Sequence, residues 1–242
     1  MKIIDALIEK LPEDMPVRSV LVGARWIVVC SRRCGMAATL QSDHPHGHAQ
    51  VRDVGRLHKK NAHELAEYAR STDLLEASIG VAAINSLLPV NESLAVEINA
   101  SEVLADRGRG KNVALIGHFP FIPQLREVAD HLWVIEQNPT EEEYPAEAAA
   151  DLLPQADMVA ITGSTLINHT LDHLLSLCSS KVTVMVLGPS TPLSPLLFDY
   201  GVDIISGTYV VDETAVMRTV GQGAVFRQVE GTKLLTFSRA KE

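Results

Sequence analysis

The first part of the chain carries short β-branched runs with the pattern of an antiparallel sheet. Val17–Val22 and Trp26–Cys30 are β-branched runs, and the turn Gly23-Ala24-Arg25 between them predicts a hairpin. Met36–Leu40 is expected to add a third strand. Before the hairpin, residues 1–16 have the amphipathic pattern of a short helix.

Two helices are predicted after a polar stretch that spans residues 41–60. Spacings typical of capping boxes mark helix starts at Asn61 and Asp73. The second helix, Asp73–Leu88, is apolar on nearly all sides and should therefore be buried. Together with the hairpin, these helices predict a small α+β domain over residues 1–98.

From residue 99 onward, continuous apolar runs alternate with helical patterns. The expected strands are Val113–Gly117, Leu132–Glu136, Met158–Thr162, Val182–Gly188 and Asp203–Ser206, with Leu234–Phe237 as a late edge strand. The expected helices are Gln124–Asp130, Ala146–Leu153, Ile167–Cys178 and Asp212–Gly221. Strands without a polar face, alternating with helices, predict an α/β domain at 99–242 with a parallel sheet covered on both faces.

Composition excludes several classes of protein. The 242 residues contain 21 Lys and Arg against 30 Asp and Glu, a net charge of −9, which argues against nucleic-acid or anionic-membrane binding driven by charge. No apolar run reaches the ~18 residues of a membrane span, and the acidic N-terminal segment does not read as a signal peptide. Cys30, Cys34 and Cys178 are too few for a disulfide framework, so we expect a reducing cytoplasm.

Four loops after predicted strands share a composition that suits ligand binding. In an open parallel sheet, ligands bind beyond the carboxyl ends of the strands. The loops there are Gly117-His118-Phe119-Pro120, Thr162-Gly163-Ser164-Thr165, Gly188-Pro189-Ser190-Thr191 and Ser206-Gly207-Thr208. Glycine permits close backbone approach, and hydroxyls and free helix amides suit anionic groups. One such loop is an ordinary turn, but four on one edge predict a pocket.

The familiar nucleotide-binding motifs are absent. The sequence has neither a P-loop nor a G-x-G-x-x-G run after its first parallel strand. Glu136, however, ends the next strand, where a carboxylate that binds a ribose would fall. A nonstandard nucleotide or S-adenosylmethionine site is therefore kept as an alternative, with Glu136 as its cofactor-binding residue.

Histidines are the candidate metal ligands. His44, His46 and His48 alternate in a segment whose proline and glycine disfavour regular structure, and imidazoles in such a loop can converge on a borderline divalent transition metal. Their spacing matches no established zinc pattern, so a solvated polar loop is the alternative. His118, in the first strand-end loop, is a further metal-ligand or acid–base candidate. The alternative for His118 is an imidazole bonded to a backbone carbonyl.

Three strand-end segments resemble a known family. Residues 116–122 (IGHFPFI), 157–171 (DMVAITGSTLINHTL) and 187–193 (LGPSTPL) are similar to those of a bacterial and archaeal family of uncharacterised proteins linked to heavy-metal chelation. The segment 78–85 (SIGVAAIN) looks like the helix signature of that family's first domain. The resemblance implies an enolase-N-terminal-like domain, a Rossmann-like domain after it, and a site between them. The positions that carry over to this site are Gly117, Thr162, Gly163, Thr165, Asn168, Gly188, Pro189, Ser190, Thr191 and Asn85.

We therefore expect a cytoplasmic two-domain protein that binds a metal ion, or a small anionic or metal-chelating metabolite, between its domains. A divalent transition metal is the expected cofactor, and a homo-oligomer stays open. One alternative is a small-molecule enzyme with a nucleotide-like cofactor. A second is a non-catalytic subunit that binds a partner protein.

Overall fold

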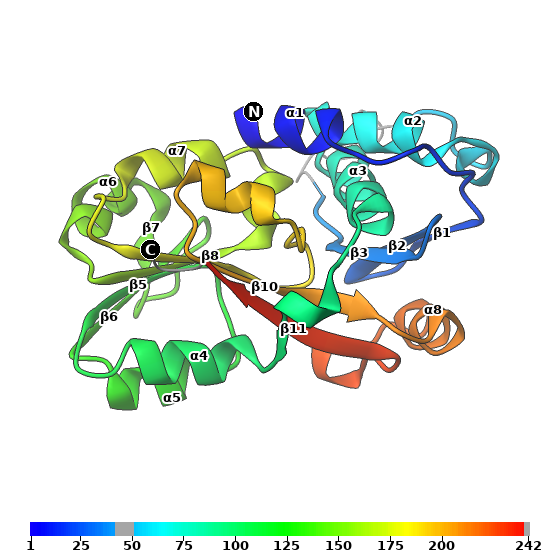
Figure 1. Ribbon diagram of the computed structural model, residues 1–242. Coiled ribbons are helices and arrows are strands. Elements are labelled where there is room, and N and C mark those ends of the chain that lie inside the picture. Colours follow the sequence, from blue (N-terminus) through cyan, green and yellow to red (C-terminus); the bar gives the residue numbers. More distant parts are fainter. Residues whose placement is uncertain (42–50, 240–242) are drawn as a thin grey trace.

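The computed structural model describes residues 1–41 and 51–239, which form two sheets with helices packed on them (Figure 1). The small sheet is antiparallel, in the order β1 (Ser19–Val22), β2 (Trp26–Cys30), β3 (Cys34–Ala38). The large sheet has eight strands in the order β4-β11-β10-β9-β8-β5-β6-β7 and is mostly parallel. The predicted fold class, a small antiparallel unit followed by a Rossmann-like α/β sheet, is confirmed.

Three helices accompany the small sheet: α1 (Lys2–Glu9), α2 (Ala62–Ala66) and α3 (Leu74–Leu87). The Asp73 carboxylate caps α3 by accepting from the amides of Leu75 and Glu76. A Cβ on Gly80 would lie 1.9 Å from the Ala69 nitrogen, so α3 packs backbone to backbone on the preceding turn. The burial of α3 is as its all-round apolar sequence predicts.

The parallel core of the large sheet consists of β5 (Asn112–Ile116), β6 (His131–Glu136), β8 (Met158–Thr162), β9 (Thr183–Leu187) and β10 (Ile204–Val210). Short β7 (Tyr144–Pro145) pairs parallel to β6. At the other edge β11 (Thr232–Ser238) is antiparallel to both β10 and β4 (Val96–Glu97). The antiparallel edge is a common addition to a doubly wound sheet.

Helices cover both faces of the large sheet. One face carries α4 (Ala100–Arg107) and α5 (Ile122–Val128), and the other carries α6 (Ala149–Leu152) and α7 (Leu171–Leu177), while α8 (Glu213–Gly221) lies beyond β10 (Figure 1). Side chains of β5 alternate between these layers. Val113 and Leu115 pack with α4 and α5, and Ala114 and Ile116 pack in the opposite cluster.

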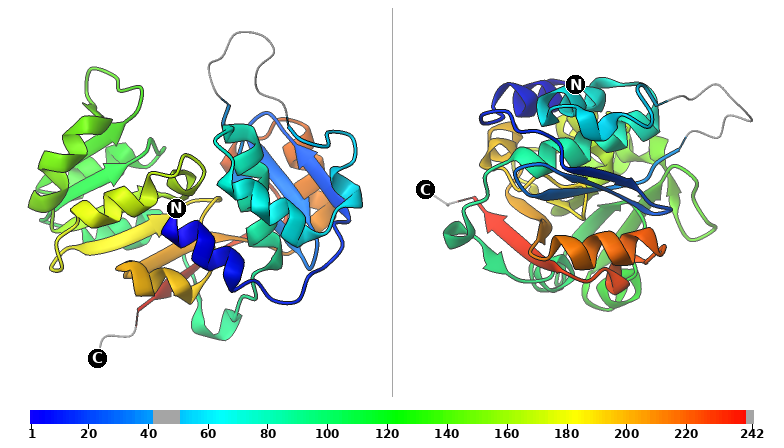
Figure 2. Two further views of the ribbon diagram at one scale, coloured as in Figure 1. Left: turned by 90° about the horizontal axis from the view of Figure 1, so that it is seen from above. Right: turned by 90° about the vertical axis from the view of Figure 1, so that its right-hand side faces the viewer.

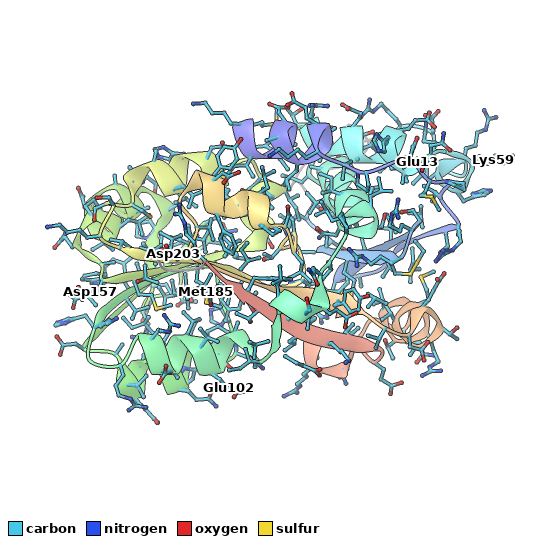
Figure 3. The ribbon with its side chains drawn as sticks, viewed as in Figure 1. Glu13, Lys59, Glu102, Asp157, Met185 and Asp203 are labelled. Carbon is cyan, nitrogen blue, oxygen red and sulfur yellow. A yellow bond between two sulfur atoms is a disulfide. The ribbon has the colours of Figure 1, made fainter. Side chains whose placement is uncertain are left out.

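The amino edge of the large sheet is closed by aspartates. Asp157 and Asp203 lie at this edge (Figure 3) and accept from the amides of Asn112 and Val184, each at 2.9 Å. Because these bonds satisfy the ends of the strands, the amino edge has a structural role. The carboxyl edge is the one left for ligands.

The small sheet sits over the carboxyl edge of the large one (Figure 2). The Ser190 hydroxyl, after β9, accepts from the Ala38 amide at 2.9 Å, and the His169 ring, after β8, bonds the Ala69 carbonyl at 2.8 Å. Apolar residues of β2 and β3, including Val28 and Met36, share a buried cluster with residues of α8, such as Val216 and Val220. The small sheet therefore completes its core with a helix of the large unit.

Two local expectations are wrong. The helix expected from Ile167 begins only at Leu171, because His169 adopts a left-handed backbone (φ 60°). A disulfide joins Cys30 and Cys34, where the cysteine count predicted none. These two residues oppose each other in the β2–β3 register with their Cα atoms 4.0 Å apart. The number of cysteines in a sequence does not show that a hairpin turn brings two of them together.

Across residues 1–41 and 51–239, every helix is too short or too polar to span a bilayer.

Candidate functional site

A cavity of about 390 Å³ opens beyond the carboxyl ends of β5, β6 and β8. The turn before α7 and the helices α6 and α7 form its walls, and Leu40, after β3, adds a contact from the small unit. The cavity contains seven residues singled out in the sequence: Gly117, His118, Glu136, Thr162, Ser164, Thr165 and Asn168. Its volume is in the range of sites for small metabolites.

The floor of the cavity depends on two tight turns. Gly117 takes a φ of +110° directly after β5, a conformation that L side chains rarely adopt. After β8, the Thr162 hydroxyl accepts from the Ser164 amide at 3.3 Å and begins the 3₁₀ turn Gly163–Leu166. The Thr165 hydroxyl donates back to the Thr162 carbonyl at 2.7 Å. These bonds fix the hydroxyl-bearing turn at the strand end.

Asn168 is held by a local turn of its own. Its Oδ1 accepts from the amide and the hydroxyl of Thr170, at 3.3 and 2.7 Å. The Nδ2 group takes no part in these bonds, so it is the end of the amide that can donate to a ligand.

His118 is oriented by a carboxylate. Its Nδ1 donates to Glu143 Oε1 at 2.6 Å, and Glu143 Oε2 also accepts from the Thr140 amide at 2.9 Å. The Thr140 amide, and next the His118 ring, hold the pKa of the Glu143 carboxyl below its ordinary value. With Nδ1 as the donor, Nε2 is the ring nitrogen available to a metal or a proton. The His118 side chain is 65% exposed, so it lies at the mouth of the cavity.

The charge of the lining favours some ligands over others. Glu136 and Glu147 contribute carboxylates, and His118 and His173 contribute imidazoles. The described residues that line the cavity include no Lys or Arg. A free anion would therefore meet carboxylates without a compensating cation, whereas a cationic group or a metal complex would be attracted.

The cavity does not offer a convergent metal site of its own. Among residues 1–41 and 51–239, three ligand atoms come within 4.8 Å of one another only at Cys30, Cys34 and Glu213, away from the cavity. The remaining candidate ligands, His44, His46 and His48, lie outside the described residues. The described lining therefore fits a metal only if the metal arrives with other ligands.

The second group of predicted residues lies between the two sheets. Gly188 takes a φ of +105°, and Ser190 and Thr191, after Pro189, are 1% and 2% exposed. Asn85 donates to the carbonyls of Met36 and Ser190, at 2.9 and 3.3 Å. Gly163 is buried against this loop, where a Cβ would lie 2.5 Å from Thr191 Oγ1. Asn85 and Ser190 therefore join the two units, and none of these positions lines the large cavity.

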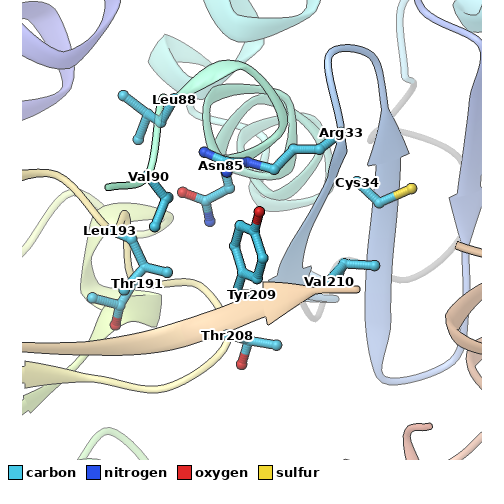
Figure 4. A pocket seen from close by; sticks show the side chains of 10 residues that line it. All are labelled: Arg33, Cys34, Asn85, Leu88, Val90, Thr191, Leu193, Thr208, Tyr209 and Val210. Carbon is cyan, nitrogen blue, oxygen red and sulfur yellow. The ribbon is translucent and has the colours of Figure 1, made fainter. Parts of the chain in front are cut away.

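A small void lies between the units, beside Asn85 (Figure 4). Four of its lining residues carry a buried polar atom that has no hydrogen-bond partner within the described chain: Arg33 Nη2, Asn85 Oδ1, Thr191 Oγ1 and Thr208 Oγ1. Its volume of about 10 Å³ is that of one water molecule. One water could bridge such groups, but a metabolite could not enter.

Several residues near these spaces were not predicted from the sequence. Arg33 lies 5.1 Å from the ring centroid of Tyr209, and burial lowers the pKa of its guanidinium. Glu147 and Thr170 line the large cavity without a sequence motif. His173, in α7, lines the same cavity.

Fold and cavity together define a class: a Rossmann-like sheet with a small antiparallel unit docked on its carboxyl edge. Models of a family described as "Putative heavy-metal chelation" match residues 4–88 and 99–238. The chain belongs to this family, and the resemblance inferred from its strand-end motifs is confirmed.

Relatives of known structure share the whole fold. A protein of unknown function from Desulfitobacterium hafniense is 28% identical, with a TM-score of 0.85 over 98% of both chains. A second, from Pyrococcus horikoshii, is 20% identical with a TM-score of 0.83 over 98% of both chains, a likeness of fold alone. An uncharacterised protein of Methanocaldococcus jannaschii is 29% identical over 185 residues, 74% of this chain and 70% of that protein.

Proposed function

We propose that the cavity binds a divalent transition metal held in a complex with a small chelating metabolite. One observation carries the proposal: a space of about 390 Å³ lined by two carboxylates and two imidazoles, with no Lys or Arg among the described lining residues. Family membership supports a role in heavy-metal chelation. In such a complex the chelator supplies the metal ligands that the lining itself does not bring together.

Each part of the cavity has a separate task in this proposal. His118 Nε2 approaches the metal from the mouth, while Glu143 holds the ring in place. The turn with Ser164 and Thr165, and the Asn168 amide, orient oxygen atoms of the chelator. Apolar side chains such as Ile135 pack against its carbon skeleton.

A second candidate is an enzyme with a nucleotide-like cofactor. Glu136 ends β6, the strand after β5 in the sheet, and its side chain lines the cavity. A carboxylate at this position in a Rossmann-like sheet binds the ribose hydroxyls of a cofactor. The same cavity would then hold an adenosine group.

Native mass spectrometry with elemental analysis of the purified protein tests both candidates. We expect one equivalent of a transition metal together with an organic mass. An organic mass that contains adenosine and no metal would establish the second candidate. A metal without an organic mass would mean that the chain chelates the metal directly, with His44, His46 and His48 as the first ligands to examine.

Two substitutions test the location. We expect Thr165→Val and His118→Ala to lose the bound complex while the fold is kept. Thr219→Val is the matched control, because its hydroxyl also donates to a local carbonyl, that of Ala215 at 2.9 Å, but lies in α8. Retention of the complex by both cavity variants would contradict the proposal.

The pH dependence tests the imidazole. Protons compete with a metal for neutral histidine, so retention of the complex should fall as the pH drops from about 7.5 to 5.5, through the reference histidine pKa of ~6.5. In His118→Ala any residual binding should lose this dependence. A wild type that keeps the metal equally at both pH values would exclude His118 as a ligand.

A further inference from the structure

A second set of metal-ligating side chains lies outside the cavity. Cys30 is the last residue of β2, Cys34 is the first residue of β3, and Glu213 lies in the first turn of α8. One ligand atom from each of the three side chains lies within 4.8 Å of the other two. The group brings together the small sheet and a helix of the large unit.

The hairpin and the helix are held in this arrangement by Arg18. Its guanidinium donates through Nη1 to the Ser31 carbonyl at 2.7 Å, and through Nη2 to Glu213 Oε2. Ser31 belongs to the turn between the two cysteines, so Arg18 places the carboxylate beside the sulfur atoms. Glu213 Oε1 is left as a potential ligand, because the ion pair uses Oε2.

The site is closed on one side and open on the other. Cys30 and Cys34 are 0% and 5% exposed and belong to the apolar cluster between β2, β3 and α8. The side chains of Arg18 and Glu213 are 47% and 43% exposed, so an ion can approach from their side. Cys34 also lines the small void, but its sulfur is turned away from Asn85 (Figure 4). None of the three side chains lines the large cavity.

We propose that the reduced Cys30–Cys34 pair and Glu213 bind one thiophilic divalent cation, such as Zn²⁺ or Cd²⁺, and that disulfide formation closes the site. Thiolates select soft and borderline cations over Mg²⁺ or Ca²⁺. Two sulfurs and one carboxylate oxygen supply three positions of a tetrahedral site, and the fourth is left for water or a small external thiol. This site does not depend on the function proposed for the cavity.

The chemistry of opening and loading balances. A dithiol reductant transfers two electrons and two protons to the disulfide, which becomes two thiols while the reductant becomes a disulfide. Binding of the cation then releases the two thiol protons to solvent. Oxidation reverses both steps and expels the cation. In a reducing cytoplasm, where we propose that the protein acts, the open form prevails.

Titration of the full chain with Cd²⁺ tests the proposal, with the thiolate-to-cadmium charge-transfer absorption as the readout. Histidine ligation is silent in this absorption, so His44, His46 and His48 do not contribute. We expect one equivalent in the chain reduced by a phosphine and then freed of reductant, and none in the oxidised chain. The two samples share one sequence, so a folding defect cannot explain the difference.

Variants assign the ligands. Cys34→Ser should abolish the absorption, whereas Cys178→Ser should leave it unchanged. Glu213→Gln should weaken Cd²⁺ binding by about tenfold or more, since loss of a group that merely supports a metal ligand already costs 10–100-fold. Its matched control is Glu230→Gln, which removes an exposed carboxylate paired with Arg218.

Three results would overturn the proposal. They are equal absorption in the oxidised and reduced chains, loss of absorption in Cys178→Ser, and full affinity in Glu213→Gln. Thr165→Val, which tests the cavity, should bind Cd²⁺ at this site like the wild type. Failure of the cavity proposal and failure of the thiolate site are thus separate outcomes.

Discussion

Gly163→Ala should destabilise the protein and disturb the cavity through a single steric contact. Gly163 begins the turn after β8 and is buried against the loop after β9. A Cβ there would lie 2.5 Å from Thr191 Oγ1 and 2.6 Å from the Thr191 nitrogen. An ordinary contact begins at 3.4 Å, so the two loops would have to separate by 0.9 Å (3.4 minus 2.5).

The expected cost follows from this overlap. Overpacking by one methyl group in a closely packed region costs about 1–3 kcal/mol. The loss of glycine freedom in the unfolded chain works in the other direction by about 0.4–1 kcal/mol. The φ of Gly163 is not in the left-handed region, so the backbone itself adds no strain. We expect a net loss of about 1–2 kcal/mol in the free energy of unfolding.

Urea unfolding followed by circular dichroism measures this change. Gly221→Ala is the matched control, because a Cβ at the end of α8 would lie 3.7 Å from its nearest neighbour, Leu21 Cδ2. That variant should gain about 0.5 kcal/mol, as alanine does over glycine in a helix. In Gly163→Ala the displaced turn carries Ser164 and Thr165, so retention of the cavity ligand should fall as well. Equal stability of Gly163→Ala and wild type would refute the close contact between the loops.

Three further predictions concern single side chains. Burial raises the pKa of the Cys178 thiol from 9.0 to about 11. At pH 8 its thiolate fraction, and with it the rate of alkylation by iodoacetamide, should therefore be about 100-fold below that of an ordinary thiol. Mass spectrometry measures this rate, and a rate equal to that of the chain unfolded in urea would contradict the prediction. Burial raises the pKa of the Glu76 carboxyl, but hydrogen bonds from Arg52 outweigh it and hold the pKa below its ordinary value. The ionised form then stabilises the fold above the unfolded-state pKa, and this stability is lost as the pH falls through the folded-state pKa. The urea midpoints of wild type and Glu76→Gln should therefore converge as the pH falls below the reference glutamate pKa of ~4.3, and a constant gap would refute the assignment. Ser190→Ala leaves the Ala38 amide without its acceptor and should cost about 1–3 kcal/mol, whereas Ser176→Ala, whose hydroxyl is exposed, should stay within about 0.5 kcal/mol of wild type.

The architecture could be predicted because its signals are local. Strands such as Met158–Thr162 are buried on both faces and read as continuous apolar runs, and α3 begins at its capping aspartate. Helix α4 was missed because only Leu104 of its eight residues is buried, so no apolar stripe marks it.

The sequence could not predict which strand-end loops line the cavity and which contact the small sheet, because this depends on how the small sheet packs on the large one. The loops after β8 and β9 have nearly the same Gly, Ser and Thr composition, yet Ser164 lines the cavity and Ser190 binds the Ala38 amide. Which loop faces a ligand is decided by where the small sheet sits, a long-range contact with no sequence signature. The same holds for Glu213, which reaches the cysteine hairpin only through the docking of α8.

The apolar cluster shared by β2, β3 and α8 has an evolutionary consequence. Although two family models match the two parts of the chain separately, Val28 and Met36 on one side and Val216 and Val220 on the other bury each other. Neither part can change its side of this cluster without a compensating change in the other. A chimera that joined residues 1–98 of this chain to the second part of the Desulfitobacterium relative would therefore combine two halves of different cores, and inheritance should keep the two parts fused and co-adapted.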